Sequence, residues 1–126
     1  MLSENGKKDD QPKAEPKKEP KPIGDNDKLP NQGEVTAGVA GAPPVDAGKQ
    51  GKHVPGHAVE EEGRSKWEQG ENGVRETQEA WVNGTPVAPA EPEGSVRIGT
   101  GGSGREIKVH QDSKGNIHGY PVEKQE

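Results

Sequence analysis

The sequence of 126 residues contains no cysteine and no phenylalanine, and it has only two tryptophans and one tyrosine. Without cysteine the chain can form no disulfide framework. Hydrophobic residues make up 24% of the chain, well below the share of an ordinary globular domain. This composition allows one small domain with a lean core, and a partner that binds the folded state would stabilise such a domain by mass action.

Long apolar runs are also missing. No stretch approaches the roughly 20 residues that cross a bilayer, and no apolar signal-peptide region follows Met1, so we expect no membrane span. The formal net charge is −5, which argues against broad electrostatic capture of nucleic acid. Any contact with nucleic acid therefore has to come from a local basic patch.

The first third of the chain has the composition of a linker. Proline recurs four times between Pro12 and Pro22 among lysines and glutamates, and small residues follow in A-G-V-A-G-A-P-P. Such a segment favours a semi-rigid spacer and has too few apolar residues to offset the entropy cost of ordering it. We predict a disordered linker over residues 1–45 and a folded domain over residues 46–126. The alternative for the first segment is a peptide that docks in a partner's groove.

Residues 95–122 carry a clear strand pattern. Apolar and polar residues alternate over residues 96–98 and 107–109, which is the period of a half-buried strand. Asp112 and Gly115 stand where a three-residue hairpin with a bulge needs them, because glycine readily adopts the positive φ of the last turn position. The pattern predicts a three-stranded antiparallel meander.

The turn after Asp112 sets the register of the second hairpin. Counting back from the turn places His110 opposite His118 and Lys108 opposite Tyr120. Directly opposed side chains share one face, with Cβ atoms roughly 4.5–5.5 Å apart. The two histidines are therefore predicted to be neighbours.

The first hairpin is connected by the glycine-rich residues 101–104. Read as a four-residue loop, this connection pairs Ile98 with Ile107 on the core side and Arg97 with Lys108 on the histidine side. Opposed like charges destabilise a sheet, so this pair indicates that an anion binds there.

The other two histidines, His53 and His57, are four residues apart. On a helix this spacing would indicate a metal pair, but Pro55 and Gly56 lie between them, so a zinc site is the weaker alternative. The acidic residues 60–62 are interpreted as a solvated charge run.

A short helix is predicted from Val74 to Val82. Val74, Gln78, Trp81 and Val82 fall on one side at helical spacing, and Gly84 follows as a stop signal. We expect Trp81 to pack this helix on the sheet.

The two ends of residues 48–122 resemble a known family. They read K-Q-G-K-H-V-P-G-H…G-R-S and V-H-Q-D-S-K-G-N-I-H-G-Y-P. Both blocks are similar to those of bacterial polymorphic-toxin RNase domains of the barnase/EndoU/colicin/RelE-like fold, which form the C-termini of contact-dependent growth inhibition effectors. The matching residues are Lys49, Gln50, Lys52, His53, Gly56, Arg64, Ser65, His110, Ser113, Lys114, Gly115, His118 and Pro121.

The resemblance implies an α+β fold in which short N-terminal helices pack on a small antiparallel sheet. It implies cleavage of RNA, often tRNA, without metal or other cofactor, and a cognate immunity protein that neutralises the toxin. It also implies delivery, by secretion or from the cell surface, as the C-terminal part of a larger effector that acts in the cytoplasm of the target cell.

Metal-independent RNA cleavage needs a base for the 2′-hydroxyl, an acid for the leaving 5′-oxygen, and cations for the charge that develops on the phosphate. Histidine suits both proton roles because its pKa lies near neutrality. The catalytic candidates are His53, His110 and His118. The candidate substrate-binding residues are Lys52, Arg64, Ser65, Arg97, Lys108 and Tyr120.

Two other interpretations remain open at this point. The chain could be a proline-rich adaptor whose C-terminal meander only binds a protein, as its low hydrophobicity and acidic charge favour. It could also be a zinc-dependent hydrolase that uses some of the four histidines.

Overall fold

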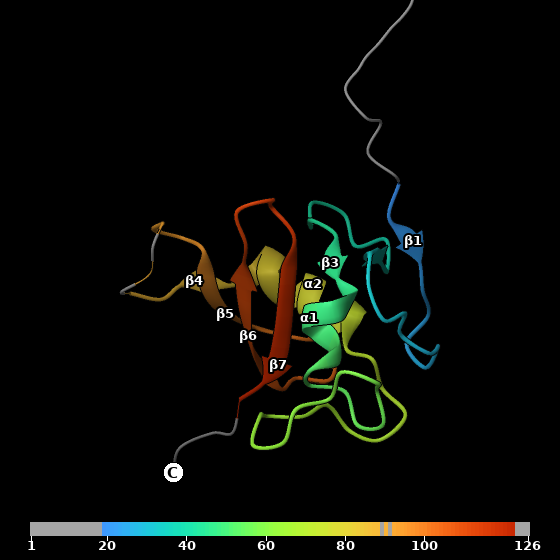
Figure 1. Cartoon of the computed structure of the whole chain (residues 1–126). Helices are drawn as coiled ribbons and strands as arrows, with labels where there is room; N and C mark the ends of the chain where they lie inside the picture. Colours follow the sequence, from blue (N-terminus) through green and yellow to red (C-terminus); the bar gives the residue numbers. More distant parts are fainter. Residues whose placement is uncertain (1–18, 89, 91, 123–126) are drawn as a thin grey trace, which may run out of the picture.

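The computed structural model describes residues 19–88, 90 and 92–122. Its elements are β1 (Lys21–Pro22), β2 (Glu34–Thr36), β3 (Val45–Asp46), α1 (Ala47–Gly51), α2 (Val74–Asn83), β4 (Thr85–Pro86), β5 (Val96–Thr100), β6 (Glu106–Gln111) and β7 (Ile117–Pro121). The strands form one sheet in the order β1-β2-β3-β7-β6-β5-β4 (Figure 1). Neither helix of the described ranges is long and apolar enough to cross a bilayer.

The sheet is mixed. β1 pairs with β2 and β3 with β7 in parallel, whereas the other neighbours are antiparallel. The expected combination of helices and sheet is confirmed. The expected antiparallel sheet is wrong, because β1–β2 and β3–β7 are parallel pairs. The expected helices-first order is also wrong, because β1, β2 and β3 precede α1. The last strand, β7, lies in the middle of the sheet, where it joins the meander to the short strands of the first third of the chain.

Residues 19–45 belong to the folded unit, so the linker predicted over residues 1–45 is wrong for this part. Leu29 and Val35 are only 3% and 1% exposed and contribute to the core. The prediction failed because these isolated apolar residues are buried by elements that come much later in the chain. Residues 1–18 lie outside the described residues.

Buried amide side chains hold this first segment in place. Gln78 of α2 donates from Nε2 to the Pro43 carbonyl at 2.8 Å. Asn72 donates from Nδ2 to the carbonyls of Gly24 and Asp27, both at 2.8 Å. These bonds satisfy backbone groups that such short strands leave without sheet partners, and a buried group left unpaired would be costly.

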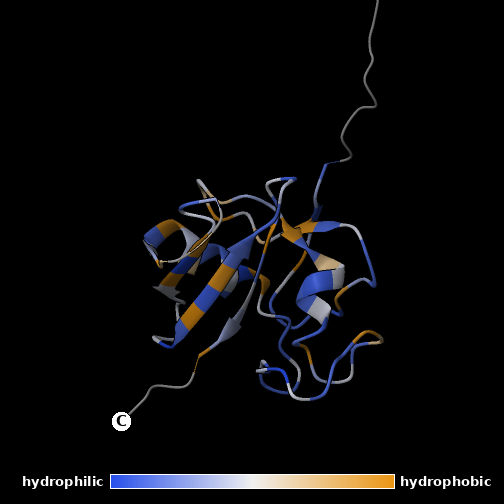
Figure 2. Cartoon of the chain, turned by 60° about the vertical axis from the view of Figure 1, so that its left-hand side comes forward, coloured by the Kyte–Doolittle hydropathy of each residue, from blue (hydrophilic) through white to orange (hydrophobic). Residues whose placement is uncertain are grey.

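Helix α2 covers one face of the sheet, behind it in the view of Figure 1. The helix begins at Val74 as predicted and ends at Asn83, one residue beyond the predicted end, and Val74, Gln78 and Trp81 are buried. Val82 is 49% exposed, so its predicted place on the packed side is wrong. The core comprises Leu29, Val35, Val45, Ala47, Val54, Trp67, Val74, Ala80, Trp81, Ile107, Val109 and Ile117. Figure 2 shows hydrophilic and hydrophobic bands alternating along the sheet, as expected for strands with one packed face.

The register of β6 and β7 is the predicted one. His110 faces His118 and Lys108 faces Tyr120. Gly115 in the connecting turn has a φ of 90°, the left-handed conformation that the turn requires. The turn residues therefore determined this pairing.

The register of β5 and β6 differs by one residue from the prediction. Ile98 faces Lys108 rather than Ile107. The connection spans residues 101–105 rather than four residues, with Gly104 at a φ of 92°. Since side chains alternate along a strand, a slip of one residue moves every side chain of β5 to the other face.

This slip relocates Arg97. It faces Val109, on the side covered by α2. Its guanidinium lies 3.8 Å from the centre of the Trp81 ring, and Nη1 donates to the Trp81 carbonyl at 3.1 Å. The predicted Arg97–Lys108 pair is therefore absent, and Arg97 points away from the histidines.

Candidate functional site

Three histidines and the tyrosine gather on the sheet face opposite α2. The histidine–tyrosine cluster consists of His110 of β6, His118 and Tyr120 of β7, and His53, which follows α1. Ring centres are 5.3 Å apart for His110 and His118 and 4.5 Å apart for His53 and Tyr120, with the planes of each pair within 28° of parallel. The structure thus brings together all three catalytic candidates.

His53 is held in a defined tautomer. Its Nδ1 lies 2.8 Å from the Ser65 carbonyl, which can only accept, so Nδ1 carries the hydrogen. In the neutral ring, Nε2 then carries the lone pair. Burial lowers the pKa of His53, as do the charges of Arg64 and Lys52, and these effects outweigh the Ser65 bond. His53 is therefore a neutral imidazole with a free basic nitrogen at pH 7.

His110 and Tyr120 share a hydrogen bond of 2.8 Å between Nε2 and the hydroxyl. Burial lowers the pKa of His110, and the nearby charge of Lys108 lowers it further. Burial also raises the pKa of Tyr120, so the phenol stays protonated at neutral pH. Both partners of this bond are consequently uncharged.

His118 has the largest shift of the cluster. Burial, followed by the neighbouring His110 and His53, lowers the pKa of His118 to about 3. Its Nδ1 is buried and has no hydrogen-bond partner among the described residues. At neutral pH this ring is uncharged and cannot serve as a cationic acid.

His57 has a structural role instead. Its Nε2 donates to the Pro30 carbonyl at 3.0 Å, and its Nδ1 accepts from the Val59 N–H at 3.1 Å. The segment from His53 to His57 is not helical. Within the described parts of the chain, no group of three or more His, Cys, Asp or Glu residues is arranged to hold a metal ion.

A surface cavity of about 410 Å³ adjoins the cluster. It is lined by His53, Glu61, Glu62, Gly63, Arg64, Ser65 and Tyr120. A second cavity of about 580 Å³ shares residues 63–65 with it and continues past Lys66 and Arg105. The two together form a path along the surface past His53 and Tyr120.

The predicted cations occupy different places. Lys52 and Arg64 flank His53, close enough to lower its pKa. Lys108 lies half-buried on the cluster's face, paired with Tyr120. Ser65 contributes its backbone carbonyl. Of the predicted substrate-binding residues, only Arg97 is on the wrong face.

Two polar residues beside the cluster were not among the candidate site residues predicted from the sequence. Gln50 is fully buried, accepts from the Gly119 N–H at 2.9 Å and donates to the Asn72 carbonyl at 3.0 Å, so it fixes α1 against β7 beside the cluster. Glu61 lines the cavity and contacts the two cations next to His53. The family-like block includes Gln50, but no pattern in the charge run singled out Glu61.

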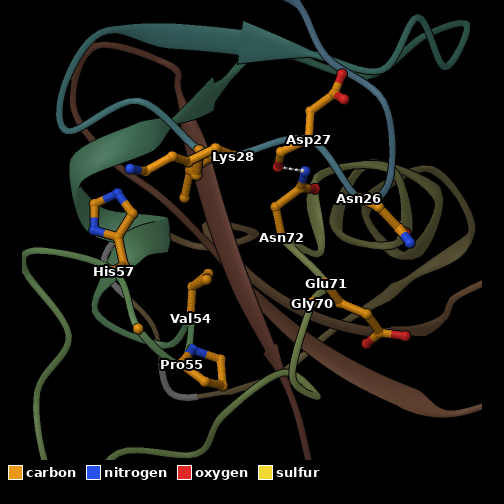
Figure 3. Close-up of a pocket in the computed structure, with 11 residues that line it drawn as sticks. Asn26, Asp27, Lys28, Val54, Pro55, His57, Gly70, Glu71 and Asn72 are labelled. Carbon is orange, nitrogen blue, oxygen red and sulfur yellow. Dashed lines mark hydrogen bonds between the residues drawn. The ribbon is translucent and has the colours of Figure 1, made fainter.

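A separate small pocket lies between residues 26–29, 54–57 and 70–72 (Figure 3). Its volume is about 140 Å³, and Figure 3 shows the Asn72 amide bonded to the Asp27 carbonyl on its wall. Of the four histidines only His57 lines it, and both ring nitrogens of His57 are engaged. This pocket lies where hydrogen bonds attach the first segment, residues 19–45, to the rest of the domain.

Comparisons of the chain with protein-family models, curated proteins and solved structures found no match. The resemblance to toxin RNase domains therefore rests on the residues of the two sequence blocks.

Proposed function

We propose that this chain is a metal-independent endoribonuclease. One observation carries the proposal: His53, neutral and fixed by the Ser65 carbonyl, lines the same cavity as Tyr120 and Arg64. A base, a protonated group and a cation are the three components that cleavage through the 2′-hydroxyl needs.

The chemistry assigns each group a step. Nε2 of His53 takes the proton of the 2′-hydroxyl, the 2′-oxygen attacks phosphorus, and the bond to the 5′-oxygen breaks. The Tyr120 hydroxyl, held by His110, gives its proton to the leaving oxygen and regains one from His53 through water. The products are a 2′,3′-cyclic phosphate and a 5′-hydroxyl. Arg64 and Lys52 offset the charge on the phosphate oxygens.

This assignment changes the expected role of His118. A ring with a pKa of about 3 carries no proton to donate at neutral pH. Instead, His118 packs between His53 and His110, with ring centres 6.0 and 5.3 Å away, and keeps both rings in place.

The biological setting follows the sequence resemblance. We propose that the substrate is RNA, with tRNA as the first class to test, and that the chain is an antibacterial toxin. A cognate immunity protein would block the cavity, and delivery would occur as the C-terminal part of a larger secreted or surface effector that acts in the target-cell cytoplasm.

The test is single-turnover cleavage of total tRNA with a chelator present. His53→Asn keeps a donor for the Ser65 carbonyl and removes the base, while Tyr120→Phe keeps the ring and removes the hydroxyl. Each is expected to slow cleavage about 10²–10⁴-fold. The rate of the unmodified chain should rise with pH below 6.5 and then level off, because the pKa of His53 is lowered.

Arg97→Gln is the matched control, since Arg97 lies on the other face. Circular dichroism and thermal melting verify that each variant is folded. Unchanged rates in both folded site variants, or 5′-phosphate ends on the products, would rule out this mechanism.

A second candidate is a non-enzymatic module that binds a protein, combined with a proline-rich leader. One observation favours it: Arg64, Lys66 and Arg105, which line the two cavities, all contact glutamates. A surface neutralised in this way attracts RNA weakly. Intact tRNA after prolonged incubation with the folded, unmodified chain would favour this candidate.

A further inference from the structure

Glu61 lines the cavity that adjoins His53. Its Oε1 accepts from Arg64 Nε at 2.7 Å, and its Oε2 lies 3.9 Å from Lys52 Nζ. The two cations of the site are thus bridged by one carboxylate of the same chain. His53, the proposed base, lines this cavity together with Glu61.

A carboxylate and a phosphate bind to such a pair of cations in similar ways. The guanidinium of arginine binds either group through the same planar set of donors, and a lysine ammonium adds a point charge. A phosphate that entered the cavity would therefore have to take the place that Glu61 holds.

We propose that Lys52 and Arg64 form a phosphate-binding site and that Glu61 is its built-in competitor, displaced when an anionic ligand enters. This inference deepens the proposed function by adding how its phosphate site is controlled. The contacts are suited to exchange, because the side chains of Glu61 and Arg64 are 43% and 48% exposed, and exposed ion pairs are weak.

Glu62 provides a matched control within the same cavity. It follows Glu61 directly, carries the same charge and also lines the cavity. Among the described residues it makes no ion pair. Removing the charge of Glu62 measures only how strongly a nearby carboxylate repels anions. Removing the charge of Glu61 has this effect and also frees Lys52 and Arg64.

The experiment is a titration of the full chain with inorganic phosphate, followed by the NMR signals of the His53 ring and the Arg64 side chain. Glu61→Gln is expected to bind phosphate about two- to fivefold more tightly than the unmodified chain, the range expected when a weak exposed pair is removed. Glu62→Gln is expected to change the affinity less than twofold. Adding Arg64→Gln to the Glu61→Gln variant should abolish the shift at His53.

Equal effects of Glu61→Gln and Glu62→Gln would overturn the inference, because general charge would then explain both. The absence of any phosphate shift at His53 in Glu61→Gln would also overturn it. A parallel tRNA cleavage assay separates the two proposals. Tighter phosphate binding without any cleavage supports the phosphate site and contradicts the nuclease, whereas cleavage with unchanged phosphate affinity contradicts the role of Glu61 alone.

Discussion

The two faces of the sheet differ in burial and in the side chains they carry. Under α2, Ile107, Val109 and Ile117 are fully buried and pack against the helix. On the opposite face the same strands present His110, His118, Tyr120 and Lys108, all of which remain partly exposed. Because side chains alternate along each strand, one short sequence builds both the core and the candidate site.

The difference shows how a lean sequence can support a site. The packed face supplies most of the stability through complete burial of a few branched side chains. The cluster face is compact enough to keep its rings neutral, as the lowered pKa values of His53, His110 and His118 show, yet it remains next to an open cavity.

The largest expected stability effect comes from truncating matched isoleucines on the two faces. Ile107→Ala removes a fully buried side chain under α2 and should lower the free energy of unfolding by about 2–5 kcal/mol. Ile98→Ala, at a partly exposed position on the cluster face, should cost less than about 1.5 kcal/mol, the low end of the range for full burial. Chemical denaturation measures both, and equal costs would show that the cluster face is packed as tightly as the core.

Acid should lower the stability of the domain mainly through the histidines of the cluster face. The pKa of His118 is about 3 in the folded chain and near 6.5 when unfolded, so the unfolded state binds more protons between these values. Stability is therefore complete above pH 6.5 and falls as the pH is lowered. The expected loss between pH 6.5 and 5 is roughly 2 kcal/mol from this residue, with smaller losses in the same direction from His53 and His110.

Denaturant unfolding at the two pH values measures this loss. Between pH 6.5 and 5, the carboxylates whose pKa values are lowered, such as Asp112 and Glu61, stay ionised and contribute little to the loss of stability. His118→Phe keeps an apolar ring and should flatten the pH dependence. An unchanged slope in this variant would show that His118 is not the group responsible.

The smallest effect is expected for Arg97, whose charge lies on the helix side. Arg97→Gln removes the contact with the Trp81 ring, worth about 0.5–1 kcal/mol at a partly exposed site. Thermal melting should show a small decrease, and phosphate binding at His53 should be unaffected. A clear loss of phosphate affinity would mean that Arg97 reaches the cluster face in solution.

The sequence predicted the structure best where turn chemistry acts locally. Asp112 and Gly115 specify the turn, and the facing of His110 and His118 follows from it. The glycine-rich loop before Glu106 allows connections of either four or five residues, so it left the register of β5 open by one position.

Long-range effects could not be predicted from the sequence. The burial of Leu29 and Val35 depends on amides such as Gln78 that are far along the chain, and no local pattern announces these bonds. The position of Glu61 likewise depends on how its loop folds back to Lys52. In the sequence, nothing distinguishes Glu61 from the other acidic residues of the same charge run.

The central place of β7 has a consequence for biosynthesis. This strand leaves the ribosome after every other described element, yet it joins β3 to β6 and supplies His118 and Tyr120. The strands made first can pair with each other and contact α2, but β3 and β6 are joined within the sheet only through β7, so the sheet of the nascent chain should be completed only after β7 is released. A nascent chain stalled before Ile117 would lack both the middle of its sheet and half of its histidine–tyrosine cluster, so the site is completed only with the last strand described.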